Sequence, residues 1–448
     1  MSHILPSSEI SMLFPAMPSK QASDPACEPP IYQLPAEILA TIFKLAVDNV
    51  ESWEKFTPEH LSFVCRRWYD AALAHVILWS RIHLSHNTQR VYECTSLVPY
   101  TLRRLQRSRK ALLDVKVIYQ NEEWHTKYLP AFLECIGKHG EVMRRWGSLY
   151  ISGYHVPIPV MDLLCYPTPN LRELGFDCHQ DSKFDTSHIL PLTPKLRTVT
   201  LSNGKHSSSS FRYPRHTPRT VTHLQITSYD IEFACHAIQP FTSLRVLRLH
   251  IFHSRTAGWP LTFPAMTTFP HLRDLWTNSV RRSQALFMNI STPALTHLRL
   301  CLNQDSEEDT SSILVAFEPL LSQITHLEVQ ALHCQSPLDF GEFLRRFGNL
   351  KELHISGVGR YMEYRERWWP VASEDYSGVL EDPSLCLWLE RCVVGGVVRE
   401  DLVNIRRTDS ENLWVCSLWA SEKGSNSRPE YRRCFDFTPD IIKQNLGL

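Results

Sequence analysis

The sequence lacks an excess of charge of either sign and any paired cysteine motif. Its 448 residues include 47 lysines and arginines and 47 aspartates and glutamates, so the formal net charge is zero. That balance argues against a nucleic-acid binder held by counterion release, which needs a basic excess. No two of the 13 cysteines stand at C-x-x-C spacing, which argues against a zinc finger and favours reduced thiols in an intracellular protein.

Long apolar runs and familiar catalytic motifs are missing as well. The longest apolar run, Cys392–Val398, is far too short to span a bilayer. Residues 1–30 show no basic start followed by an apolar run, as a secretory signal requires, and read as a disordered leader. The sequence contains neither a G-x-x-x-x-G-K-[ST] phosphate loop nor a G-x-S-x-G nucleophile elbow. We therefore expect no cofactor, no metal and no membrane segment.

Residues 31–84 have the pattern of a small helical unit. Pro35 suits the first turn of a helix, and apolar residues follow it at helical spacing. Thr57 and Pro58 predict the start of a second helix that continues to Ala72. Since so few residues make only a marginal core, the unit either packs on the rest of the chain or docks its apolar surface on a partner.

The order and spacing of these residues closely resemble an F-box domain. Three motifs carry the resemblance: Leu34-Pro35-x-Glu37-Ile38-Leu39-x-x-Ile42-Phe43, Leu61-x-x-Val64-Cys65-Arg66-Arg67-Trp68, and Leu78-Trp79. The departure from the family pattern is a longer loop at residues 48–56, which is typical of F-box-like variants. The combination of motifs is far more specific than any one of them.

The resemblance implies a docking function. F-box domains bind the Skp adaptor, which links them to a cullin and a RING subunit in a ubiquitin ligase. Some of the matching residues must hold the helices together, and the sequence does not sort them from the contacts. Carried over by position, the residues that would bind the Skp adaptor are Leu34, Pro35, Ile38, Leu39, Ile42, Phe43, Val64, Cys65 and Trp68.

A second pattern, L-x-x-L-x-L, recurs through residues 146–359. Its first positions are residues 146, 171, 196, 221, 244, 272, 295, 324 and 350. The alternation predicts strands, and helical patterns lie between some of them, at residues 313–321 and 340–347. Steps of this length are those of leucine-rich repeats, which the segment resembles. Irregular turns predict an uneven α/β solenoid with parallel strands on its concave side.

Residues between the apolar positions of each strand are expected to line one outer surface. Trp276 there is either an interface anchor or is buried by a slip in register, since Thr277 makes a poor core residue. Arg248, His297, Arg299 and His326 could read an acidic or phosphorylated segment. The recurring histidines lack a carboxylate or cysteine partner in the pattern, so we do not expect a zinc site.

Residues 360–448 show no clean repeat, although residues 385–398 and 413–419 have strand patterns. This segment either caps the repeats or folds over the concave face and helps to bind the target. A hidden enzyme in this segment is a further alternative. Its test is whether the polar residues converge in a closed pocket.

The sequence therefore predicts an α+β multidomain protein in which a small all-α F-box module precedes an irregular α/β leucine-rich-repeat solenoid. The predicted segments are a leader at 1–30, the F-box-like domain at 31–84, a linker and entry at 85–145, the repeats at 146–359 and the C-terminal cap at 360–448. Such chains resemble a large group common in mushroom-forming fungi.

The predicted function is that of a non-catalytic substrate-recognition adaptor in a Skp–cullin–F-box ubiquitin ligase. Its expected partners are the Skp adaptor, a cullin through that adaptor, and a target protein, without nucleic acid or membrane. The expected location is the cytoplasm or nucleus. The alternative is an F-box scaffold that binds proteins without ubiquitin ligation.

Overall fold

The structure is a computed structural model, and it describes only part of the chain. The described residues are 34–48, 58–85, 97–118, 129–137, 140–153, 166–178, 193–203, 219–229, 231–252, 266–279, 283, 286–301, 310–330, 332–333, 337–355, 358–362, 367–370, 389, 391–395, 402–408 and 413–419. The predicted leader at residues 1–30 and most of the predicted C-terminal segment lie outside them.

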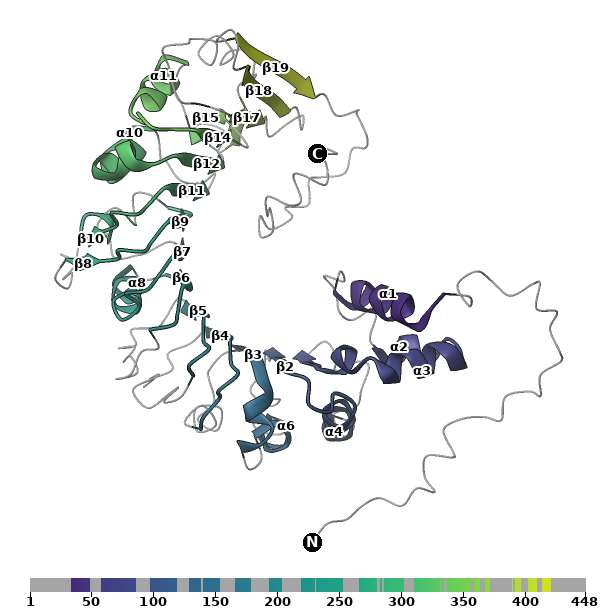
Figure 1. Cartoon of the computed structure of the whole chain (residues 1–448). Coiled ribbons are helices and arrows are strands. Elements are labelled where there is room, and N and C mark those ends of the chain that lie inside the picture. The colour runs from purple at the N-terminus through teal and green to yellow at the C-terminus, as the bar shows by residue number, and fades with distance from the viewer. Residues whose placement is uncertain are drawn as a thin grey trace, which may run out of the picture. The chain divides into compact units, whose positions relative to one another are not determined.

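The described residues form a mixed α/β fold of helices and extended parallel sheet. The chain divides into two compact units, residues 1–244 and residues 245–448. Both are drawn in Figure 1, and each is described by itself below. The predicted domain boundaries stay predictions.

The first unit begins with a group of short helices. They are α1 (Ala36–Asp48), α2 (Pro58–Ser62), α3 (Arg66–Ala74) and the 3-10 helix η4 (Val76–Trp79). Pro35 stands just before α1, and its carbonyl accepts a hydrogen bond from the Leu39 N–H at 3.1 Å. Glu37 lies in the first turn, where a negative charge suits the helix dipole.

The prediction of one continuous helix from Thr57 to Ala72 is wrong, because the structure breaks it between α2 and α3. Cys65 is fully extended, with φ −162° and ψ 170°, so the helix cannot continue through it. Its Sγ instead accepts a hydrogen bond from the Trp68 N–H at 3.5 Å and caps α3. Thr57 lies outside the described residues.

A parallel sheet follows in the same unit, with six strands in chain order among the described residues. They are β1 (Arg81–Ser85), β2 (Leu113–Ile118), β3 (Trp146–Gly153), β4 (Glu173–Cys178), β5 (Thr198–Asn203) and β6 (His223–Ser228). The register places Leu149 beside Leu174, Leu174 beside Val199 and Val199 beside Leu224. The periodic apolar residues therefore stack into one buried layer, and the sheet extends two strands N-terminal to the first predicted repeat.

Helices accompany this sheet. They are α4 (Leu97–Arg107), α6 (Leu129–Gly137), the 3-10 helix η8 (Met143–Arg145) and α8 (Ile231–Ile238). Helix α4 packs on α6, on η4 and on β1, so it joins the helical group to the start of the sheet. Leu129, Phe132 and Ile136 form the buried side of α6.

A tight turn precedes several of the strands. At Thr168, Thr193 and Thr292, each followed by proline, the threonine carbonyl accepts a hydrogen bond at 3.1 Å from the leucine N–H three residues later. Phe241, Phe269 and Phe347 hold the same turn position in other copies. All six side chains are buried, so the turn position belongs to the core whichever residue type occupies it.

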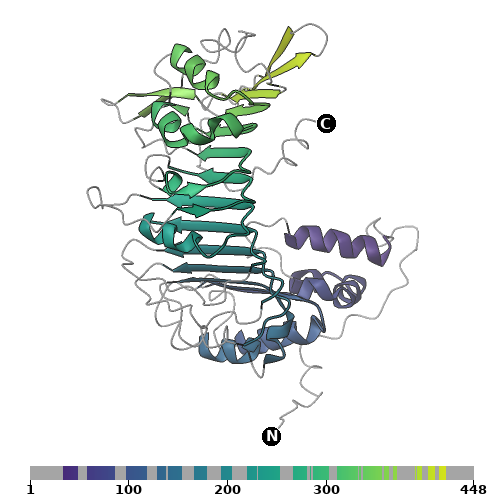
Figure 2. The same ribbon diagram turned by 60° about the vertical axis from the view of Figure 1, so that its left-hand side comes forward.

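The second unit continues the same strand pattern. Its parallel strands are, in order, β7 (Val246–Ile251), β9 (Asp274–Thr277), β11 (His297–Cys301), β12 (His326–Gln330), β14 (Glu352–Ile355) and β17 (Arg391–Gly395). Leu247, Leu275, Leu298, Leu327 and Leu353 stand at one register position and are all buried. Figure 2 shows these strands stacked edge to edge within the unit.

Antiparallel strands end this sheet. Strand β18 (Leu402–Thr408) pairs with β17, and β19 (Leu413–Trp419) pairs with β18, both antiparallel. The predicted strand at residues 413–419 is confirmed, and β17 lies inside the predicted strand at residues 385–398. Residues 371–388 lie outside the described residues. Between residues 371 and 390 the structure describes Leu389 alone, and this residue is buried.

The second unit also contains helices and small sheets besides its main strands. The helices are α10 (Thr310–Phe317), the 3-10 helix η9 (Glu318–Gln323) and α11 (Pro337–Arg345). Figure 1 shows α10 and α11 on one side of β11, β12 and β14. Two short parallel strands pair as β8 (Thr267–Thr268) and β10 (Ile290–Ser291). A further sheet joins β13 (Leu332–His333), β15 (Val358–Met362) and β16 (Arg367–Pro370).

Candidate functional site

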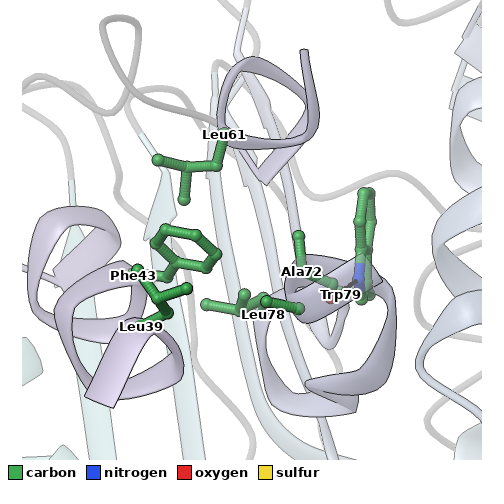
Figure 3. Packing of buried hydrophobic residues seen from close by; sticks show 7 residues of the cluster. Leu39, Phe43, Leu61, Ala72, Leu78 and Trp79 are labelled. Carbon is green, nitrogen blue, oxygen red and sulfur yellow. Dashed lines mark hydrogen bonds between the residues drawn. The ribbon is translucent and has the colours of Figure 1, made fainter. Parts of the chain in front are cut away.

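The first candidate site is the helical group at the start of the chain, which we name the helical module (residues 34–48 and 58–79). Side chains from α1, α2, α3 and η4 gather in one core, as Figure 3 shows. The core residues are Leu39, Phe43, Leu61, Ala71, Ala72, Leu78 and Trp79. The indole N–H of Trp79 donates to the Ala72 carbonyl at 2.7 Å, which satisfies its polar atom in the core.

The residues predicted to bind the Skp adaptor divide into two groups. Leu39 and Phe43 are completely buried in the module core, so they hold the helices together. Trp68 packs on Phe43 with ring centroids 4.9 Å apart, and Leu34 also lies against the core. Cys65 is half-buried and caps α3. These five residues shape the module from within.

The other predicted residues face outward. Ile38 is 47% exposed, Ile42 is 37% exposed and Val64 is 53% exposed, and Pro35 is exposed beside them in the sequence. Ile38 and Ile42 are four residues apart on α1, which places them on one face of the helix. Exposed branched side chains at helical spacing form an apolar stripe available to a partner.

Three further apolar residues of the module are exposed and were missed by the sequence analysis. Leu45 extends the stripe of Ile38 and Ile42 by one turn of α1, at the spacing that could have revealed it. Phe63 is 72% exposed in the turn between α2 and α3, and Ile77 is exposed on η4. Phe63 had no usable signal, since the predicted continuous helix ran through it.

Helix α4 fastens the helical module to the first strands. Arg104 is buried, and its guanidinium meets the Glu59 carboxylate with Nη2–Oε2 at 2.7 Å and Nε–Oε1 at 3.2 Å. Its Nη1 donates to the carbonyl of Arg81 on β1. The guanidinium of Arg107 lies 4.2 Å from the centroid of the Trp79 ring. Burial lowers the pKa of Arg107 from its usual value.

A polar cluster on β1, β2 and β3 surrounds Asp114. His83 Nε2 lies 3.1 Å from its Oδ2, Arg81 Nε lies 3.9 Å away, and the Ser148 hydroxyl donates to it. Burial acts to raise the pKa of the Asp114 carboxyl, but these three neighbours outweigh burial and lower the pKa below its ordinary value.

The second candidate site is the outward strand face of the second unit. It carries the side chains between the buried leucines of β7, β9, β11, β12 and β14, and we name it the strand face. Its described members are Val246, Arg248, His250, Asp274, Trp276, His297, Arg299, His326, Glu328, Glu352 and His354. All five residues predicted to contact a target belong to it.

Trp276 and Thr277 keep the regular register. Trp276 pairs with Arg248 on one side and Arg299 on the other and is half-buried, while Thr277 is completely buried. The slip that would have buried Trp276 therefore does not occur. Thr277 is tolerated in the core because its hydroxyl meets the Ser279 carbonyl and the Ser283 hydroxyl, each at 3.1 Å.

The predicted basic residues of the strand face differ in their contacts with carboxylates. Arg299 lies between two carboxylates, with Nη2 at 3.4 Å from Asp274 Oδ2 and Nε at 3.7 Å from Glu328 Oε2. His326 Nε2 lies 3.6 Å from Glu352 Oε1. Arg248 is exposed at the β7 end of the strand face, and none of the ion pairs among the described residues includes it.

Two ring contacts fix the positions of aromatic and imidazole side chains on the strand face. The rings of His297 and His326 stack with centroids 4.0 Å apart and an interplanar angle of 10°. The rings of His250 and Trp276 lie 4.0 Å apart at 41°. Burial, and then the neighbouring His326, lower the pKa of His297, and burial with the charge of Arg248 lowers the pKa of His250 to about 4.

Metal ligands do not converge in the part of the chain that the structure describes. No group of three or more histidine, cysteine, aspartate or glutamate side chains there could hold a metal ion. No described helix combines the length and apolar character needed to cross a membrane.

Comparisons with known protein families and with curated proteins find no match for this chain. The class that the described structure defines is a mixed α/β fold with a helical module and a repetitive parallel sheet.

Proposed function

We propose that the chain is a non-catalytic adaptor of a Skp–cullin–F-box ubiquitin ligase. In this proposal the helical module is an F-box domain that docks on the Skp adaptor. The strands from residue 146 onward belong to an irregular leucine-rich-repeat solenoid that holds the target protein. The cullin and the ubiquitin-transfer chemistry then reach the target through the partners.

One observation carries the proposal. The residues that match the F-box motifs separate into a closed core around Leu39 and Phe43 and an exposed apolar stripe at Ile38 and Ile42. In a module with no docking role, polar residues at these positions would avoid exposing an apolar patch to solvent. An apolar stripe beside a complete core is what a docking helix requires.

The repetition of the strands supports the second half of the proposal. Successive copies of L-x-x-L-x-L stand side by side at equal register, from Leu149 to Leu224 in the first unit and from Leu247 to Leu353 in the second. Each copy adds one strand to a buried leucine layer and leaves its outer positions free to vary. A recognition surface for a protein target fits such an arrangement.

The test is co-purification of the full chain with the Skp adaptor of its host. The decisive variant is Ile38→Asp/Ile42→Asp, which places charge on exposed positions and leaves the module core intact. A carboxylate buried at the interface without a partner should weaken binding by about a hundredfold or more. The control is Lys44→Asp, since Lys44 is exposed on α1 away from the apolar stripe.

The proposal predicts that the wild-type chain and the Lys44 variant bring down the adaptor and cullin and that the double variant does not. Equal recovery with the double variant, or none with the folded wild-type chain, would contradict it. Target turnover in cells separates a ligase adaptor from the scaffold alternative, because a scaffold would bind the adaptor without shortening the lifetime of its targets.

A further inference from the structure

We propose that the strand face binds an extended basic segment of a target protein, with an apolar side chain of that segment on Trp276 and a lysine or arginine beside Glu328 and Glu352. The inference rests on the proposed role of these strands in target binding. It replaces the acidic or phosphorylated target that the sequence suggested with one of opposite charge.

Among the predicted anion-binding residues, Arg299 and His326 already lie beside carboxylates, while the exposed Arg248 lies on β7 at the edge of the strand face. Arg299 already meets Asp274 at 3.4 Å and Glu328 at 3.7 Å, and both carboxylates come from neighbouring strands. An incoming phosphate or carboxylate would have to displace them or approach two negative charges. His326 likewise lies 3.6 Å from Glu352.

The charge of the β9 to β14 part of the strand face is negative when its imidazoles are neutral. Three carboxylates, those of Asp274, Glu328 and Glu352, oppose the single guanidinium of Arg299. The side chain of Glu352 is 48% exposed, so its carboxylate remains accessible to a partner although it lies 3.6 Å from His326 Nε2. Charge complementarity therefore favours a cationic partner, both in encounter and in discrimination against acidic competitors.

An ordered aromatic ring adjoins this acidic region. Trp276 is fixed from one side by His250, whose ring centroid lies 4.0 Å away, and it remains partly exposed. His250 stays neutral at physiological pH, since its pKa is lowered to about 4. A tryptophan held in place loses little entropy on binding and suits an apolar or cationic side chain of a partner.

The distance between strands sets the separation expected between the apolar and the basic residues of the target segment. From β9, strands β12 and β14 are two and three neighbours away. At roughly 4.8 Å per strand these steps amount to about 10 Å and about 14 Å. An extended chain advances about 3.3 Å per residue, so the basic residues should follow the apolar anchor by about three and four positions.

His297 adds a dependence on pH. Thr296 and Thr325 hydroxyls hold Nδ1 of His297 and His326 at 2.8 Å, which fixes both rings. Protonation of His297 adds positive charge in the middle of the strand face, where a basic segment would lie. The charged and titratable groups that face the pair from the adjoining strands are Asp274, Arg299, Glu328, Glu352 and His354. Because burial, and then the neighbouring His326, lower the pKa of His297 below its ordinary value of 6.5, binding of a basic segment should weaken only as the pH falls below that value.

Two fluorescein-labelled decapeptides of the same length test the proposal by fluorescence anisotropy with the full chain. The basic probe carries tryptophan followed three and four residues later by lysine and arginine, and the acidic probe carries glutamates at those two positions. The basic probe should bind at least about tenfold more tightly. Equal binding, or tighter binding of the acidic probe, overturns the proposal.

Substitutions in the strand face test whether the basic probe binds there. Glu352→Lys and Trp276→Ala should each weaken binding of the basic probe by about tenfold. The control Glu342→Lys changes an exposed carboxylate on α11 and should leave binding unchanged. Equal effects of the Glu352 and Glu342 substitutions would show non-specific attraction and overturn the proposal.

The failure of this inference can be told from a failure of the proposed function. The Ile38→Asp/Ile42→Asp variant should bind the basic probe like the wild-type chain, because its substitutions lie in the helical module. Loss of adaptor binding in the wild-type chain together with retained probe binding refutes only the ligase role. Adaptor binding without probe preference refutes only the basic-segment inference.

Discussion

Arg104 on α4 and Glu59 on α2, which are 45 positions apart in the sequence, form a two-pronged ion pair at 2.7 and 3.2 Å. Arg104 is almost completely buried and also donates to the Arg81 carbonyl on β1. One side chain thus connects the helical module, α4 and the start of the parallel sheet. This connection contributes to the orientation of the helical module, with its apolar stripe, relative to these first strands.

Removing one partner of this pair should therefore destabilise the first unit. Glu59→Gln removes the negative charge beside a buried guanidinium and should cost about 3 kcal/mol, at the low end for a buried pair because the Glu59 side chain is 22% exposed. Urea unfolding followed by circular dichroism measures the loss. The matched control is Glu342→Gln, which breaks the exposed Glu342–Arg345 pair and should cost less than about 1 kcal/mol.

The cap at Cys65 gives a second prediction. Cys65→Ala removes the sulfur that accepts the Trp68 N–H and should lower the stability of the first unit by about 1 kcal/mol. Cys65→Ser supplies a better cap oxygen and should keep or raise stability. Thermal unfolding of the two variants decides the matter. Equal destabilisation by alanine and serine would mean that packing of the thiol, and not capping, is the role of Cys65.

Two buried threonines should respond in opposite ways to replacement by valine. Among the described residues the Thr193 hydroxyl has no hydrogen-bond partner, so Thr193→Val removes an unsatisfied polar group and should leave stability unchanged or raise it. Thr277→Val takes the partner from Ser279 and Ser283 and should cost about 1–3 kcal/mol. Calorimetric melting temperatures test the contrast, and equal shifts would refute it.

The cluster around Asp114 predicts a dependence of stability on pH. The pKa of Asp114 in the folded chain lies below its ordinary value of 3.8, so the folded state binds this proton less readily than the unfolded state. The stabilisation is complete above the ordinary value and is lost as the pH falls through the lowered value. Asp114→Asn should flatten the fall of the melting temperature in that acid range, while a slope equal to that of the wild-type chain would contradict this assignment.

The arrangement of the strands could be predicted from the sequence because one residue type repeats at one position. Leu298 and Leu327 occupy the same place in successive copies, and the structure puts them side by side. The outer neighbours follow from the same register, so Arg299 beside Glu328 was within reach of the sequence. The arrangement of charges at the outer positions depends on neighbours across strands, which the pattern along a single strand does not show.

The helical module could be predicted only in part. Apolar spacing along α1 marks a helix with a wide apolar face, but it does not tell the buried Leu39 from the exposed Ile42. That distinction depends on where α2, α3 and η4 pack. The helix break at Cys65 and the Arg104–Glu59 ion pair depend on tertiary structure. Local helix propensity continues through Cys65, and it gives no information about which residues pair across 45 positions of the sequence.

Hydrogen–deuterium exchange of the full chain, with and without the Skp adaptor of its host, tests the central claim most directly. The account predicts that the adaptor slows exchange in α1 and in the turn between α2 and α3, around Ile42 and Phe63, and leaves the strands at residues 246–355 unchanged. Binding of the adaptor without protection of these segments, or protection confined to the strands, would contradict the claim that this chain docks through its helical module.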